Sequence, residues 1–112
     1  MKVTKTKIHD VLVLDPGRFY DKRGFFSETW SQRTFEKVGI KNDFVQDNHS
    51  FSLKARTLRG LHFQYPPAAQ AKLVRCGKGE FLDVVVDIRR GSPTFGDWLS
   101  ETLSFDNGKQ LF

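Results

Sequence analysis

The residues best suited to chemistry lie in one short segment, Arg59–Gln64, whose sequence is Arg-Gly-Leu-His-Phe-Gln. It sets a cation, a glycine and a proton-transfer base within four residues. Histidine can take up and return a proton near neutral pH, and a glycine lets a ligand or another backbone come close. A histidine in a strand can also be an ordinary hydrogen-bonded residue. The segment therefore predicts acid–base chemistry at His62 but does not establish it.

The element that must position this histidine is a strand from about Leu58 to Gln64, ended by Tyr65-Pro66-Pro67. In a regular strand Arg59 and His62 point to opposite faces. For both to reach one ligand the strand needs a bulge or a bend, and we predict it at Gly60.

A second candidate strand, Phe44–Ser50, places Gln46, Asn48 and Ser50 on one face. Two amides that face the same way can read a ligand through paired donors and acceptors. An ordinary polar outer face would have the same pattern, and the residues alone leave both interpretations open.

The rest of the chain alternates short apolar runs with turn signals. Met1–Lys7 has the period of a strand but carries much lysine, which is typical of an edge strand. A helix of about two turns is predicted from Ser31 to Val38, with Ser31 as its N-cap and Gly39 as its stop. Further strands are predicted at Val11–Leu14, Ala71–Cys76, Phe81–Arg89 and Trp98–Phe105, with Asn107-Gly108 turning the chain into a return strand.

The strand Phe81–Arg89 has the clearest alternation. It predicts an inward apolar face and an outward charged face, formed by Leu82, Val84, Val86 and Ile88 on one side and by Asp83, Asp87 and Arg89 on the other. Many short strands with little helix predict an all-β sandwich or barrel.

Length and composition set further limits. The 112 residues predict a single domain, 1–112, and eleven Phe with two Trp can fill a core without disulfides. The one cysteine, Cys76, is interpreted as a buried structural thiol rather than a nucleophile. No signal-like segment and no apolar run of about 18 residues occurs, so we expect a cytoplasmic protein and no membrane partner.

A formal charge of +5 favours anionic partners. The basic residues are scattered and show no nucleic-acid-binding motif, so we expect no nucleic-acid partner. A small ligand that carries phosphate fits the same charge.

Five blocks together resemble the dTDP-4-dehydrorhamnose 3,5-epimerase family in order and spacing. They are Arg23–Glu28, Phe44–Ser50, Leu58–Gln64, Lys72–Cys76, and Val86–Arg89 with Ser92–Gly96. The resemblance implies a cupin-type jelly roll, also called a double-stranded β-helix, with a substantial portion to follow Phe112. Residues 1–112 are thus expected to be the N-terminal part of one domain, either as a fragment or as a naturally shortened chain.

The resemblance also implies a cofactor-independent isomerase. It would epimerise C3 and C5 of dTDP-4-keto-6-deoxyglucose by removing protons next to the C4 ketone. His62 would be the base, and Lys72 would be the cation nearest the developing enolate oxygen. Binding roles would fall to Arg23 and Arg59 at the diphosphate, and to Phe26, Glu28, Gln46 and Asn48 at the nucleotide and sugar. The tyrosine acid of the family has no match here, because neither Tyr20 nor Tyr65 lies in its motif.

Three further expectations complete the sequence interpretation. Many cupins bind a metal through His-x-His, but this chain has His62-Phe63-Gln64, so we expect no metal. The edge-like Met1–Lys7 and the block Arg23–Glu28 are expected to cross to a second subunit in a homodimer. The alternatives are a single-carbon epimerase of another 4-keto sugar nucleotide, and an inactive cupin that only binds dTDP-sugars.

Overall fold

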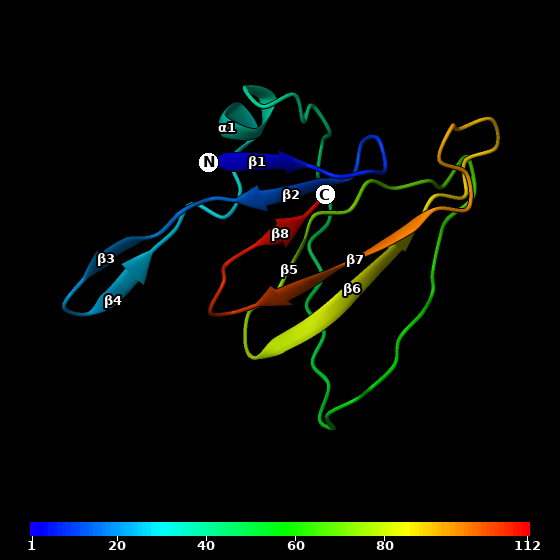
Figure 1. Ribbon diagram of the computed structural model, residues 1–112. Coiled ribbons are helices and arrows are strands. Elements are labelled where there is room, and N and C mark those ends of the chain that lie inside the picture. Colours follow the sequence, from blue (N-terminus) through cyan, green and yellow to red (C-terminus); the bar gives the residue numbers. More distant parts are fainter.

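The computed structural model describes residues 1–112 as eight strands and one short helix (Figure 1). The elements are β1 Lys2–Lys5, β2 Leu12–Asp15, β3 Phe19–Asp21, β4 Gly24–Phe26, α1 Gln32–Glu36, β5 Val74–Arg75, β6 Glu80–Val86, β7 Trp98–Ser104 and β8 Gln110–Leu111. They form a four-stranded sheet of order β1-β2-β8-β5 and two antiparallel hairpins, β3–β4 and β6–β7. The predicted all-β class is confirmed.

The N-terminal strand β1 lies at the edge of the four-stranded sheet, where it pairs only with β2. Its lysines, Lys2 and Lys5, are exposed. Lysine on an edge strand discourages uncontrolled pairing with another chain, because a charged side chain there resists burial. The predicted edge strand is confirmed, over a shorter range.

The helix α1 follows Ser31, which takes the N-cap position in extended backbone. Its hydroxyl caps no backbone N–H of the helix and accepts instead from Thr34 Oγ1 at 3.3 Å. The last helical residue is Glu36, and the chain turns away at Gly39, whose φ of +90° suits a residue without a Cβ atom. The N–H groups of Gly39 and Ile40 donate to the carbonyls of Glu36 and Phe35, at 3.1 and 3.0 Å. These two bonds form a Schellman motif, so the predicted stop at Gly39 is confirmed.

The buried core lies between α1 and one face of the four-stranded sheet. Leu14, Phe35 and Ile40 form its centre, at 0, 1 and 3% exposure. Partly buried side chains pack around them, namely Val3, Leu12, Val38, Phe44, Leu73 and Phe112. We call this side of the sheet the helix face.

The opposite face of the same sheet carries Val13, Val74 and Leu111, which the strand register places side by side. Lys109 lies two residues before Leu111 and points to this side as well, because its Nζ reaches Glu101 of the β6–β7 hairpin. Lys72 lies two residues before Val74, in the unpaired segment that leads into β5, and it is exposed. We call this the inner face. Leu73 supports the assignment, because it packs in the core of the helix face and its neighbours must then point the other way.

Two adjacent corners join the four-stranded sheet to the β6–β7 hairpin. One runs from β5 to β6 through Cys76–Gly79, and the other runs from β7 to β8. The Phe105 N–H donates to the Gly79 carbonyl at 2.8 Å and ties the corners together. The Cys76 thiol is half-buried at this corner and donates to backbone carbonyls, so it is less buried than predicted.

The turn at Asn107 does not lead to the expected hairpin with β7. The strand β8 pairs instead with β2 and β5, on the other sheet. The Asn107 side chain accounts for this: its Oδ1 accepts from the N–H groups of Ser104 and Lys109, at 3.1 and 2.9 Å. These bonds satisfy the local backbone through a side chain and let the chain leave the hairpin.

Residues 41–73 contain no strand. The predicted strands Phe44–Ser50 and Leu58–Gln64 are therefore wrong for this structure. A strand requires a neighbouring ladder to accept its backbone hydrogen bonds, and neither segment has one. Only Val74–Arg75 of the predicted Ala71–Cys76 strand is paired, with β8.

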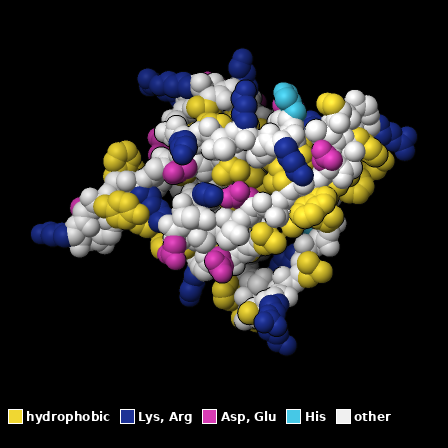
Figure 2. Space-filling view, viewed as in Figure 1, with side chains coloured by type: hydrophobic (Ala, Val, Ile, Leu, Met, Phe, Trp, Pro, Cys, Tyr) yellow, Lys and Arg dark blue, Asp and Glu magenta, His cyan; other side chains and the backbone are white.

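The molecule exposes far more surface than its length requires. A compact monomer of this length would expose about 6300 Å², whereas this chain exposes 9256 Å². Figure 2 shows hydrophobic side chains on the hairpin that projects at the left, where Phe19, Tyr20 and Phe26 are about 70% exposed. The only helix is five residues long, and no helix of the chain could cross a bilayer.

Candidate active site

Lys72 is the predicted catalytic cation, and it lies on the inner face next to β5. Its Nζ donates to Gln64 Oε1 at 2.7 Å. Gln64 follows His62 by two residues, so this bond holds the segment of the predicted base beside Lys72. The structure therefore brings Lys72 and the His62 segment together, although 10 positions separate the two residues in sequence.

The two predicted amides also meet. Gln46 Nε2 donates to Asn48 Oδ1 at 3.0 Å. They lie two residues apart and point the same way, although the segment is not a paired strand. Each amide keeps a free carbonyl or amino group with which it could contact a ligand.

Arg59 lies in an exposed segment and is held by weak contacts. Its Nε donates to Ser52 Oγ at 3.3 Å, and its Nη2 donates to the Phe51 carbonyl at 3.4 Å. The following residue, Gly60, has a φ of +102°, a backbone conformation that side-chain-bearing residues rarely adopt. The predicted irregularity at Gly60 is present, but it is not a bulge, because no ladder exists there.

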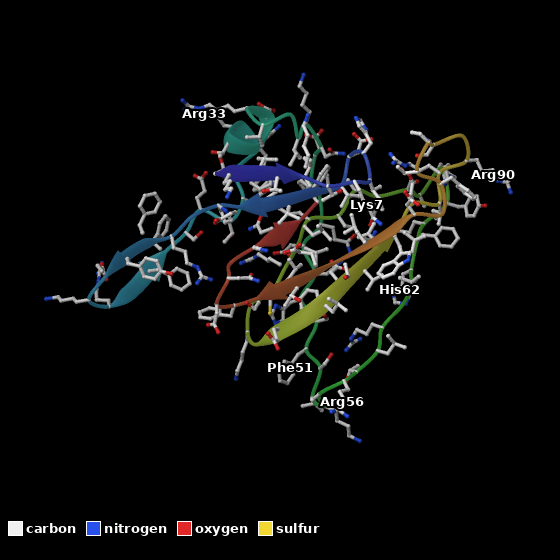
Figure 3. The ribbon with its side chains drawn as sticks, viewed as in Figure 1. Lys7, Arg33, Phe51, Arg56, His62 and Arg90 are labelled. Atoms are coloured by element: carbon white, nitrogen blue, oxygen red, sulfur yellow. The ribbon has the colours of Figure 1, made fainter.

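Arg23, Phe26 and Glu28 lie on or just after the β3–β4 hairpin. Arg23 pairs with Asp21 at 2.6 Å and holds the pKa of that carboxyl below its usual range. Glu28 Oε1 accepts from Thr34 Oγ1 at 2.7 Å. In Figure 3 the hairpin projects on the side opposite to His62. These three predicted residues therefore do not share a site with His62 within one chain.

The base of this hairpin is fastened to the β7–β8 turn by Arg18. Its guanidinium lies 4.1 Å from the centre of the Phe25 ring and donates to the carbonyls of Phe105 and Asp106. Phe25 also contacts Phe105, with their ring centres 5.7 Å apart. Phe19, Tyr20 and Phe26 remain about 70% exposed. The hairpin is thus an arm with a fixed base and an exposed aromatic tip.

The β6–β7 hairpin faces the opposite way from the sequence prediction. Its register pairs Asp83 with Glu101 and Phe81 with Leu103, so these four side chains share one face. Leu103 is fully buried and Glu101 pairs with Lys109 of the inner face at 2.5 Å, which shows that this face points inward.

The outer face of the hairpin carries the apolar residues that were predicted to be inside, and Leu82 is 61% exposed there. The prediction was wrong because period-2 alternation separates two faces but does not say which one is covered. Asp83 is half-buried, and this burial raises the pKa of its carboxyl. Sequence reasoning placed Asp83 on the outer face and did not single out Glu101, although a carboxylate within the apolar run of β6 was a visible signal.

Asp87 was also predicted to point outward, and it is buried. Its carboxylate accepts from the Arg89 guanidinium at 2.9 Å and from the hydroxyls of Ser92 and Thr94, at 2.6 and 2.7 Å. These donors hold the pKa of Asp87 far below its usual range. Arg89 also pairs with Asp10 at 3.0 Å, so the cluster fastens the 87–97 loop to the N-terminal loop.

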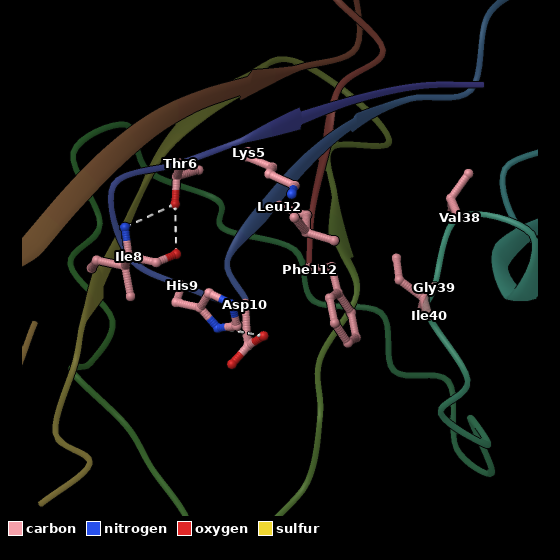
Figure 4. A pocket seen from close by; sticks show the side chains of 10 residues that line it. All are labelled: Lys5, Thr6, Ile8, His9, Asp10, Leu12, Val38, Gly39, Ile40 and Phe112. Atoms are coloured by element: carbon pink, nitrogen blue, oxygen red, sulfur yellow. Dashed lines mark hydrogen bonds and ion pairs between the residues drawn. The ribbon is translucent and has the colours of Figure 1, made fainter. Parts of the chain in front are cut away.

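Two hollows lie away from the predicted residues. One, of about 190 Å³, lies between the N-terminal loop and the end of α1 (Figure 4). The other, of about 520 Å³, opens between His9 and the loop Arg89–Pro93. Neither is lined by His62 or Lys72, and no three His, Cys, Asp or Glu side chains converge as metal ligands would.

Comparison with known proteins identifies the chain's relatives. The family model described as dTDP-4-dehydrorhamnose 3,5-epimerase matches residues 5–112. The chain belongs to this family. The Shigella flexneri dTDP-4-dehydrorhamnose 3,5-epimerase is 57% identical over the whole chain and over 62% of its own length.

Solved structures of the family have the same fold. The Bacillus anthracis dTDP-4-dehydrorhamnose 3,5-epimerase, with TDP and PPi bound, matches with a TM-score of 0.95 at 47% identity, over 98% of this chain and 63% of its own. A Legionella pneumophila 3,5-epimerase, in complex with dTDP-4-keto-L-rhamnose, matches with a TM-score of 0.91 at 44% identity, over 98% and 58%. The predicted resemblance and the cupin-type jelly-roll class are confirmed. The chain spans about three fifths of the length of these relatives.

Proposed function

We propose that this chain carries part of the active site of a dTDP-4-dehydrorhamnose 3,5-epimerase. The reaction would invert C3 and C5 of dTDP-4-keto-6-deoxyglucose, a step toward dTDP-L-rhamnose. The observation that carries this proposal is the family match over residues 5–112, together with the likeness to an enzyme that binds TDP. The contact that places Lys72 beside the His62 segment supports it from within the chain.

In the proposed mechanism His62 removes the proton at a carbon next to the C4 ketone. The electron pair moves toward the carbonyl, and an enolate forms. The Lys72 ammonium stabilises the negative charge on the enolate oxygen, and a proton is then returned to the opposite face of the carbon. An ammonium suits this task because it can reach the oxygen while a neighbouring amide, Gln64, holds its position.

The remaining predicted residues would bind the nucleotide. Arg59 suits the diphosphate, since a guanidinium donates paired hydrogen bonds to phosphate oxygens and its present contacts are weak. Gln46 and Asn48, already paired, would contact the nucleotide and sugar. From the hairpin, Arg23 would hold the diphosphate, while Phe26 and Glu28 would contact the nucleotide and sugar.

We propose that the site is built by a homodimer. Arg23 and Phe26 lie on an arm that projects away from His62 of the same chain, and Phe26 is 70% exposed. An arm that crosses to a second subunit would bury this aromatic tip and bring Arg23 to the partner's diphosphate. Light scattering should report a dimer at assay concentration, and an active monomer would contradict the proposal.

The activity itself is tested by proton exchange. Incubation of the full chain with dTDP-4-keto-6-deoxyglucose in deuterated water should replace both the C3 and the C5 protons. Exchange at one carbon only would indicate a single-carbon epimerase. Tight dTDP binding without exchange would indicate a cupin that only binds the nucleotide.

Two further proposals concern conditions. We propose that the reaction needs no metal. Exhaustive chelation should then leave the rate of proton exchange unchanged, and recovery of a lost rate by added zinc, iron or nickel would contradict the proposal.

We also propose that the protein works in the cytoplasm. A free thiol at Cys76 and the absence of a disulfide agree with a reducing compartment.

A further inference from the structure

The gap between the inner face and the β6–β7 hairpin holds charged groups of both signs. From the hairpin, Asp83 and Glu101 lie directly opposite each other on the inward side. From the inner face, Lys109 reaches Glu101 across this gap. Lys72 directly precedes Leu73, which packs on the helix face, and the Lys72 ammonium donates to Gln64. Two carboxylates side by side repel each other unless cations lie nearby.

Only one of these carboxylates has a cationic partner in the structure. Glu101 pairs with Lys109, which reaches across from the inner face. Asp83 has no side-chain partner, although it is half-buried. Burial of an unpaired carboxylate is unfavourable, which is why its pKa is raised. The gap therefore contains a half-buried carboxylate, that of Asp83, which has no cationic partner.

Lys72 is the candidate for the missing cationic partner of Asp83. The chain turns at Cys76–Gly79, and Lys72 lies as many residues before the turn as Asp83 lies after it. Asp83 points inward from β6, and Lys72 directly precedes β5 on the other arm that leaves this corner. Packed sheets lie about 10 Å apart, and the Lys109–Glu101 pair shows that a lysine of the inner face can reach the hairpin.

We propose that Asp83 is a positioning residue for the epimerisation, whose carboxylate holds the Lys72 ammonium across the gap. An ammonium has three N–H donors. Gln64 receives one of them in the structure, Asp83 receives a second, and the third is left for the enolate oxygen. The inference rests on the proposed function of Lys72.

This arrangement has a chemical purpose. A neutral amide such as Gln64 makes one ordinary hydrogen bond to Lys72. A carboxylate makes a stronger, charge-assisted hydrogen bond to an ammonium. Asp83 would thus fix the direction in which the remaining N–H of Lys72 points.

The test compares Asp83→Asn with wild type and with Asp97→Asn, an exposed control in the loop just before β7. Asp83→Asn should lower kcat about 10- to 100-fold with little change in KM. Asp83→Glu should recover part of the rate. An unchanged kcat in Asp83→Asn would overturn the proposal.

A second measurement needs neither turnover nor a change at Asp83. Carbon NMR of the Asp83 carboxyl should show that its pKa rises further in Lys72→Ala, because the neighbouring cation is lost. The same pKa in both proteins would refute the contact. If the proposed function fails, the wild-type enzyme shows no proton exchange at all, while the NMR difference still tests the pair.

Discussion

The two faces of the four-stranded sheet differ in the kind of contact they make. On the helix face, Leu14, Phe35 and Ile40 pack into the densest part of the molecule. On the inner face, Lys109 pairs with Glu101 of the β6–β7 hairpin, while Lys72 holds the segment of the predicted base through Gln64. The same sheet thus serves stability on one side and carries the proposed chemistry on the other. Alternation along a strand makes this possible, since neighbouring residues need not satisfy the same requirement.

The sharpest test of the inner face is His62→Asn in the full chain. Removal of a positioned general base costs about 10²- to 10⁴-fold in rate. Binding of dTDP should stay nearly unchanged, because His62 does not hold the diphosphate. Exchange of the C3 and C5 protons with deuterated water measures the loss, and His9→Asn, whose residue lines hollows that do not include His62, serves as the control. Wild-type exchange in His62→Asn would make another residue the base.

The matching test of the helix face is Phe35→Ala. Truncation of a fully buried phenylalanine should cost about 3–5 kcal/mol of unfolding free energy, while the rate per folded molecule stays close to that of wild type. Urea unfolding measures the first quantity and kcat measures the second. Phe95→Ala, at a 59% exposed site, is the matched control and should cost much less. Equal losses in the two variants would mean that the helix face is not the main source of stability.

Arg59→Ala distinguishes binding from catalysis. Loss of charge-assisted hydrogen bonds to the diphosphate should weaken dTDP binding about 10- to 100-fold. The rate at saturating substrate should change much less. Calorimetric titration with dTDP measures the affinity, and Arg33→Ala, on the exposed side of α1, is the control. Unchanged dTDP affinity in Arg59→Ala would remove Arg59 from the binding site.

The smallest expected effect is the acid sensitivity of the Asp87 cluster, which belongs to neither face. The folded pKa of Asp87 is lowered, mainly by Arg89 and then by the hydroxyls of Ser92 and Thr94. Its stabilising effect is therefore fully present above the ordinary aspartate pKa and is lost as the pH falls below it. Urea midpoints at neutral and acidic pH should fall less steeply with acid in Asp87→Asn than in wild type. The same acid dependence in both proteins would show that the cluster does not set it.

Local sequence determined the parts of this protein that depend on near neighbours. The stop at Gly39 follows from its backbone freedom, the lysine-bearing edge strand from its charge, and the β6 and β7 strands from their period-2 alternation. The five blocks identified the family, because their order and spacing are a property of the chain itself. The predicted proximity of Lys72 to the base was also consistent with the Gln64 contact.

Only the tertiary structure decided which surfaces are covered. Alternation in Phe81–Arg89 could not show that Asp83 and Asp87 face inward, because burial depends on what lies opposite. The segments around Gln46 and His62 have the composition of strands, yet pairing requires a neighbour that local sequence does not specify. Likewise, the departure of the chain from β7 to β8 depends on Asn107 and on competition among distant strands for the same backbone hydrogen bonds. Periodicity is a local property, whereas pairing and burial are determined by the assembled chain.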